Sequence, residues 1–186
     1  EYGIAPSLLE GEITESMLMQ DVDGTVKRLQ DLRSMGLELS MDDFGTGYSS
    51  LAFLKRLPLD VLKIDRSFVK DVLTDAHDAA IASAIITLGK TMGMSVVAEG
   101  MEEVGQANFL LARGCRFMQG YLFARPLPAD AFAQTLTSGI VMPPGLCIEA
   151  YEAAEAIQSH ASLSMPAITI PARLANPIRD PAKRRS

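Results

Sequence analysis

The chain has 186 residues, of which 48% are apolar and 22% are charged, and these proportions are typical of a globular domain with a substantial core. The net charge of −6 at pH 7 argues against binding to polymeric nucleic acid, because nucleic-acid grooves are basic. No stretch approaches the roughly 18 apolar residues of a membrane span, so we predict neither a membrane segment nor a signal peptide. The two cysteines form no zinc pattern and no disulfide framework, which predicts a cytoplasmic location.

Apolar periodicity and helix-ending glycines predict alternating strands and helices. The predicted strands cover residues 7–13, 37–41, 60–65, 95–98 and 116–118. The predicted helices cover residues 23–35, 49–56, 76–92, 103–113 and 129–137. Gly36, Gly93 and Gly114 each stand between a helix and the next strand, where glycine commonly ends a helix. Five successive βα units predict an α/β fold with a parallel sheet and right-handed crossovers.

Polar side chains, most of them acidic, stand at the ends of these strands. They are Glu12, Asp42 with Asp43, Lys63 with Asp65, Glu99 and Gln119. The carboxyl ends of parallel strands form the functional edge of such folds. Converging carboxylates suit hard divalent cations such as Mg²⁺ or Mn²⁺, and a lysine among them suits a phosphate oxygen or a metal-bound water. The pattern therefore predicts metal-assisted hydrolysis of a phosphoester.

The last part of the sequence differs in composition. Residues 140–186 contain Pro143-Pro144 and further scattered prolines, and they end in the basic run Lys183-Arg184-Arg185. This segment has no sustained apolar period, so we predict a largely disordered extension after a folded unit at residues 1–139. The basic run is interpreted as a solvated terminus.

Five stretches of the sequence resemble, in order, the motifs of the EAL-domain family. They are Glu10–Ser16, Asp42–Ser50, Leu62–Val69, Ala98–Glu102 and Gln119–Phe123 followed by Pro126. The family comprises bacterial phosphodiesterases that hydrolyse cyclic di-GMP to the linear dinucleotide pGpG in second-messenger signalling. The resemblance implies a partial TIM-type barrel, with about five of its eight βα units in this chain. It also implies a site with two Mg²⁺ or Mn²⁺ ions.

The resemblance assigns a role to each polar strand-end residue. The implied metal ligands are Glu12, Asp42, Asp43 and Glu99. Glu99 would also be the general base, and Lys63 would orient the attacking water. The implied supporting residues are Asp65, Glu102, Gln119 and Glu15. Glu15 would hold the loop at residues 42–50, or alternatively it is the acid of a helix capping box.

The sequence also departs from the family pattern. The Glu-Ala-Leu motif and a metal-binding Asn, which precede the position of Glu12 in the family, have no counterpart here. We therefore expect an incomplete domain, and two hypotheses stay open. The chain is the C-terminal part of a cyclic di-GMP phosphodiesterase, or it is a non-catalytic truncated module that binds cyclic di-GMP or a protein. The expected partners are cyclic di-GMP and either a second copy or upstream sensor or diguanylate-cyclase domains.

Overall fold

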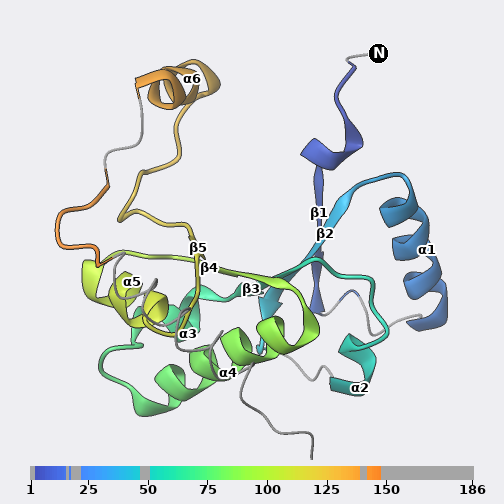
Figure 1. Ribbon diagram of the computed structural model, residues 1–186, viewed down its shortest axis with the longest axis horizontal. Helices are drawn as coiled ribbons and strands as arrows, with labels where there is room; N and C mark the ends of the chain where they lie inside the picture. The colour runs from blue at the N-terminus through green and yellow to red at the C-terminus, as the bar shows by residue number, and fades with distance from the viewer. Residues whose placement is uncertain (1–2, 16, 18–21, 47–50, 139–141, 148–186) are drawn as a thin grey trace, which may run out of the picture.

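The structure is a computed structural model that describes residues 3–15, 17, 22–46, 51–138 and 142–147. Strands and helices alternate along it (Figure 1). The strands are β1 (Glu10–Thr14), β2 (Glu38–Phe44), β3 (Val61–Ile64), β4 (Ser95–Ala98) and β5 (Phe117–Met118). The helices are η1 (Pro6–Leu8), α1 (Val22–Ser34), α2 (Leu51–Leu54), α3 (Arg66–Lys70), α4 (Ala76–Met92), α5 (Val104–Leu111) and α6 (Ala129–Ser138).

The described strands form one parallel sheet in the order β1-β2-β3-β4-β5. Each strand therefore pairs with the strand that precedes it in the chain, and the carboxyl ends meet at one edge. Figure 1 shows α1, α2, α4 and α5 along the sheet, with α6 standing apart from the other helices. The predicted α/β fold with a parallel sheet is confirmed.

The core lies between β2, β3 and the helices beside them. Met41, Leu62 and Ile64 are fully buried, and Ile86 of α4 is 1% exposed. All four residues of β3 are buried, as expected of a parallel strand that is covered on both faces. Lys63 is the polar residue of β3, so its buried position requires partners.

Local signals in the sequence explain where α4 begins and ends. Asp75 precedes α4 and accepts hydrogen bonds from the backbone N–H groups of His77 (2.6 Å) and Asp78 (3.3 Å). Gly93 follows the helix with φ of 73°, a left-handed conformation that favours glycine. The predicted end of this helix is therefore confirmed.

Two local predictions differ from the structure. The strand that we predicted from residue 7 begins at Glu10, because Pro6 starts the short 3₁₀-helix η1. Helix α3 was not predicted, and it forms because the carboxylate of Asp65 accepts a hydrogen bond from the backbone N–H of Ser67 (2.9 Å). The predicted helix at 49–56 is seen as α2, and residues 49–50 lie outside the described part.

The residues that follow α6 return to the sheet-side helices. Asn108 of α5 donates from Nδ2 to the carbonyl of Gly145 (3.0 Å) and accepts at Oδ1 from the N–H of Cys147 (2.8 Å). Leu146 packs against the core. Residues 142–147, which we had placed in the extension, thus lie against α5, and the rest of the predicted disordered extension lies outside the described residues. Among the described helices, none has the length and apolar character needed to cross a membrane.

Candidate functional site

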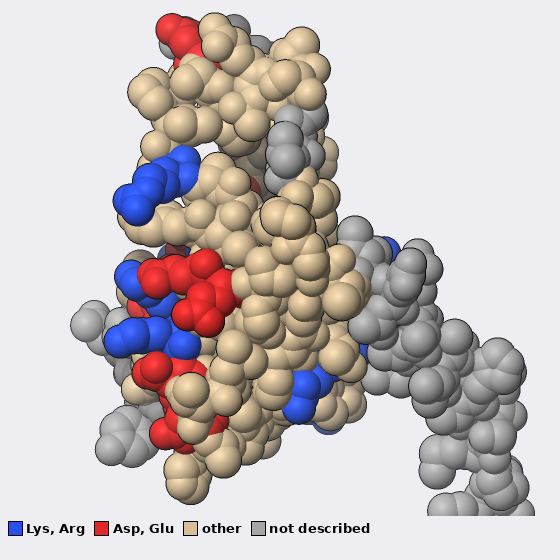
Figure 2. All heavy atoms as spheres, turned by 90° about the vertical axis from the view of Figure 1, so that its left-hand side faces the viewer, with Lys and Arg blue, Asp and Glu red and all other residues tan. Residues whose placement is uncertain are grey.

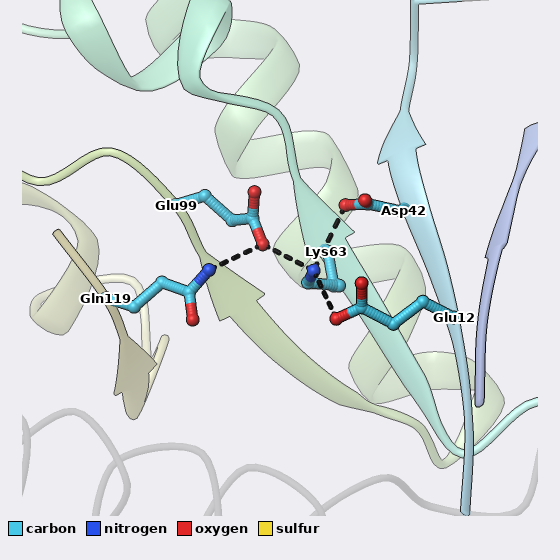
Figure 3. A network of polar contacts seen from close by, with 5 residues as sticks. All are labelled: Glu12, Asp42, Lys63, Glu99 and Gln119. Atoms are coloured by element: carbon cyan, nitrogen blue, oxygen red, sulfur yellow. Dashed lines mark hydrogen bonds and ion pairs between the residues drawn. The ribbon is translucent and has the colours of Figure 1, made fainter. Parts of the chain in front are cut away.

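The ammonium group of Lys63 lies at the centre of the strand-end cluster (Figure 3). Its Nζ is 2.8 Å from Glu12 Oε1, 3.2 Å from Asp42 Oδ1 and 2.6 Å from Glu99 Oε1. These carboxylates come from β1, from β2 and from the residue after β4. The parallel sheet therefore brings together side chains that are 87 positions apart in the sequence, from Glu12 to Glu99.

A bulge in β2 places two adjacent aspartates opposite the single residue Lys63. Met41 pairs with Leu62 and Phe44 pairs with Ile64, so Asp42 and Asp43 together stand opposite Lys63. Asp43 has φ of 54°, an uncommon backbone conformation for a residue with a side chain. As a result Asp42 contacts the Lys63 ammonium, whereas Asp43 interacts with Asp65.

Gln119 is a second partner of the Glu99 carboxylate. Its Nε2 donates to Glu99 Oε1 at 2.8 Å, and the same carboxylate oxygen accepts from Lys63. The backbone of Gln119 is fixed on both sides, because its N–H donates to Ala98 O (2.9 Å) and its carbonyl accepts from Met101 N (3.1 Å). Figure 3 shows Gln119, Glu99 and Lys63 in a continuous chain of contacts.

The cluster shifts the acidity of its central groups. Burial alone would lower the pKa of Lys63, but its close contacts with the carboxylates of Glu12, Glu99 and Asp42 raise that pKa well above its ordinary value. Burial raises the pKa of Glu99, and the neighbouring charges of Asp42 and Glu12 add to this effect, while Lys63 opposes it. Lys63 is therefore a permanent cation at neutral pH, and Glu99 is a stronger base than an ordinary glutamate.

Asp43 and Asp65 form a second carboxyl pair. Burial, the charges of Asp42 and Asp65 and a hydrogen bond with Asp65 raise the pKa of Asp43. Burial would also raise the pKa of Asp65, but hydrogen bonds from Ser67 lower it. The Asp65 carboxylate caps α3, so it has a structural task besides its place beside the cluster.

The other predicted supporting residues lie at different distances from the cluster. Glu102 contacts none of the three carboxylates, and its partner is Arg66, whose Nη2 forms an ion pair with Glu102 Oε1. Glu15 is buried, but residues 47–50 of the loop that it was expected to hold lie outside the described part. Our sequence interpretation missed Arg66. Its position directly after the Lys63-Ile64-Asp65 strand end was the signal that could have identified it.

The donor set suits a cation. Asp42 Oδ1 is buried, and among the described residues no well-aligned hydrogen-bond donor reaches it; its contact with Lys63 is an ion pair at 3.2 Å. Three carboxylates already surround one positive charge, and carboxylate oxygens are the preferred ligands of hard divalent cations. In their present positions, no group of three acidic, histidine or cysteine side chains among the described residues is arranged to hold a metal ion. Metal binding would therefore require these side chains to turn away from the ammonium.

Residues 1–126 match the family model of the EAL domain. The chain belongs to the EAL domain family. Among the similar EAL proteins is the cyclic di-GMP phosphodiesterase NbdA of Pseudomonas aeruginosa, which is 51% identical over 136 residues, 73% of this chain and 17% of NbdA. The bifunctional diguanylate cyclase/cyclic di-GMP phosphodiesterase MucR of the same organism is 50% identical over 129 residues, 69% of this chain and 19% of MucR.

Solved EAL structures share the fold. The MucR phosphodiesterase in complex with cyclic di-GMP has a TM-score of 0.67 at 50% identity, over 69% of this chain and 52% of that structure. BlrP1 of Klebsiella pneumoniae, in a manganese and cyclic di-GMP complex, has a TM-score of 0.63 at 36% identity, over 67% of this chain and 32% of that structure. The chain thus spans less than a fifth of the two curated relatives and about half of the solved MucR chain, and its sheet is part of an EAL barrel.

Proposed function

We propose that this chain is the C-terminal part of a metal-dependent phosphodiesterase that hydrolyses cyclic di-GMP to linear pGpG. The observation that carries the proposal is the contact of one buried lysine with carboxylates from three neighbouring strand ends. The names of NbdA and of the solved MucR complex support cyclic di-GMP as the substrate. The manganese complex of BlrP1 supports a divalent cation, and Mg²⁺ or Mn²⁺ is our prediction for this chain.

The reaction adds one water across a P–O3′ bond. Glu99, made more basic by burial, would take the proton as the water oxygen attacks phosphorus. The P–O3′ bond breaks, and the released O3′ takes a proton from solvent. Gln119 would keep the Glu99 carboxylate in place through its 2.8 Å hydrogen bond. Lys63 would orient the water and attract the phosphate as a fixed positive charge.

Glu12, Asp42 and Glu99 would hold a divalent cation, with Asp43 at a second one. When bound, such a cation supplies Lewis-acid polarisation of a phosphoryl oxygen and lowers the pKa of water. Asp42 Oδ1 supports this assignment, because it is buried and, among the described residues, has an ion pair with Lys63 but no well-aligned hydrogen-bond donor. We propose that three further residues support the site: Asp65, Glu102 and Glu15. We also propose that the protein acts in the cytoplasm, either next to sensor or diguanylate-cyclase domains or as a dimer.

The test is hydrolysis of cyclic di-GMP by the intact protein with Mn²⁺, with pGpG followed by chromatography. We expect Glu99→Gln to lower kcat by at least about 100-fold, because it removes a general base without changing the side-chain size. Turnover by Glu99→Gln at the wild-type rate would contradict the assignment.

The alternative is a truncated module that only binds cyclic di-GMP or a protein. The observation that favours it is that the Lys63 ammonium already engages the carboxylates of Glu12, Asp42 and Glu99, which a catalytic cation would need as ligands. Binding of cyclic di-GMP by calorimetry, together with no pGpG from the wild-type protein, would favour the alternative over the phosphodiesterase.

A further inference from the structure

A cavity of about 850 Å³ opens beside the Lys63 cluster, a volume that is ordinary for a small-molecule site. Its lining includes Glu99 and Gln119 of the cluster, residues of α6, and the charged side chains of Arg66, Glu102 and Arg125. Figure 2 shows acidic and basic side chains next to one another on the face of the molecule that it presents. The cavity therefore continues the proposed catalytic site and offers charges of both signs to a ligand.

The stem of Arg66 is packed against its neighbours, while its guanidinium, on a side chain that is 59% exposed, stays accessible. Arg66 is the first residue of α3, directly after the Asp65 cap. Its side-chain stem lies against the backbone of Gly100, where a Cβ atom would stand 2.3 Å from Arg66 Cγ. Glu102 forms an ion pair with the Nη2 end of the guanidinium. The absent side chain at residue 100 thus makes room for the arginine, and Glu102 holds its outer end.

This pair has donors and acceptors left for a ligand. A guanidinium has five N–H donors, and among the described residues the Arg66 guanidinium donates from Nη2 to Glu102. A guanidinium fork matches the O6 and N7 acceptors of guanine, and a carboxylate accepts from N–H groups such as those of a guanine base. Adenine presents an amino donor where guanine presents O6, so the same fork repels it.

The substrate chemistry places a guanine within reach. Each phosphate of cyclic di-GMP is flanked by two guanosines, so a phosphate held at Lys63 has a base on either side. Glu99 contacts Lys63 and lines the cavity together with Arg66, so the cavity adjoins the position of that phosphate. The second arginine of the cavity, Arg125, stacks on the Tyr121 ring at 4.7 Å, whereas Arg66 has an acid beside it.

We propose that Arg66, held by Glu102 over Gly100, binds a guanine base of the cyclic dinucleotide and selects guanine against adenine. The inference rests on the proposed phosphodiesterase function, and it names a specificity-determining residue of that site. The guanidinium contacts substrate in the bound state and takes no part in proton transfer. Its contribution is therefore expected in KM and in base selection, with kcat largely unchanged.

The experiment compares wild-type intact protein with Arg66→Gln and with the matched control Arg28→Gln, which changes an exposed arginine on α1. KM and kcat are measured for cyclic di-GMP, and cyclic di-AMP is used as a competitive inhibitor to obtain its Ki. We expect Arg66→Gln to raise KM for cyclic di-GMP on the order of 10- to 100-fold, with kcat within about threefold. The Ki of cyclic di-AMP is expected to stay the same or to fall, and Arg28→Gln to match wild type. Circular dichroism and a thermal melt establish that the variant is folded.

Two outcomes overturn the inference while leaving the phosphodiesterase in place. One is a KM for Arg66→Gln equal to that of Arg28→Gln. The other is a rise of KM and Ki by the same factor, which would indicate a phosphate contact without base selection. If the wild-type protein does not turn over, the proposed function fails, and the same comparison is made on the Kd values of both dinucleotides by calorimetry. Loss of guanine preference in Kd on Arg66→Gln would then still support the inference, and unchanged Kd values would overturn it.

Discussion

Replacement of Lys63 by methionine tests the central feature of the site. The change keeps an unbranched side chain that is one atom shorter and removes the one positive charge that three carboxylates contact. Removing one partner of a buried ion pair costs about 3–5 kcal/mol, whereas exposed pairs contribute about 0–1 kcal/mol. The Lys63 side chain is 8% exposed, while those of Glu99, Asp42 and Glu12 are 18%, 23% and 54% exposed. The case is intermediate, so we expect Lys63→Met to lower the free energy of unfolding by about 2–3 kcal/mol in the absence of metal.

Urea denaturation of the purified protein in chelator, followed by circular dichroism, measures this loss. Lys55→Met is the matched control, because Lys55 is exposed and the change is expected to stay within about 0.5 kcal/mol. Mn²⁺ should then stabilise Lys63→Met more than wild type, because a bound cation replaces the missing charge and binds the folded state alone. The reasoning is refuted if Lys63→Met equals Lys55→Met in chelator, or if Mn²⁺ stabilises wild type and Lys63→Met equally.

Two more predictions concern acidity and backbone approach. Burial and acidic neighbours raise the pKa of Glu99 above its ordinary value of 4.5. An NMR titration of the metal-free protein should therefore find the Glu99 carboxyl half protonated above pH 4.5. In Lys63→Met this midpoint should lie at a higher pH still, because the cation that lowers the pKa is gone. A midpoint at or below pH 4.5 would contradict the assigned environment. Gly120→Ala should lower the free energy of unfolding by about 3 kcal/mol, because its Cβ would lie 2.2 Å from Met101 N. The control is Gly93→Ala, where a Cβ atom meets no neighbour but φ is 73°, and it should lower the free energy of unfolding by about 1 kcal/mol. Equal urea midpoints for the two variants would show that the backbone at Met101 moves to accept the new Cβ atom.

The strand ends could be predicted because their signals are local. Each strand carries an apolar run with a polar residue at its end, and each pairs in parallel with its neighbour, so the residues at those ends must converge. Glu12, Asp42, Lys63, Glu99 and Gln119 do meet, as Figure 3 shows. Their roles as metal ligands, base and supporting residues stay predictions.

The details that sequence did not reveal depend on backbone geometry. Spacing along β2 does not indicate the bulge that separates Asp42 from Asp43, because adjacent residues on a regular strand already point to opposite faces. The 3₁₀-helix η1 was missed because Pro6 tolerates both an extended and a helical neighbour. The Arg66–Glu102 pair joins residues 36 positions apart through the close approach at Gly100, which no periodicity records.

The consecutive strand order has a consequence for synthesis on the ribosome. Because β2 to β5 each add to the strand made just before, a nascent chain can extend the sheet one βα unit at a time. Glu12, Asp42 and Lys63 come together once β3 has emerged, but Glu99 and Gln119 arrive only with β4 and β5. The growing polypeptide therefore brings Lys63 together with Glu12 and Asp42 early and adds Glu99, whose pKa is raised, late, so the five-residue cluster is complete only after β5 has been made.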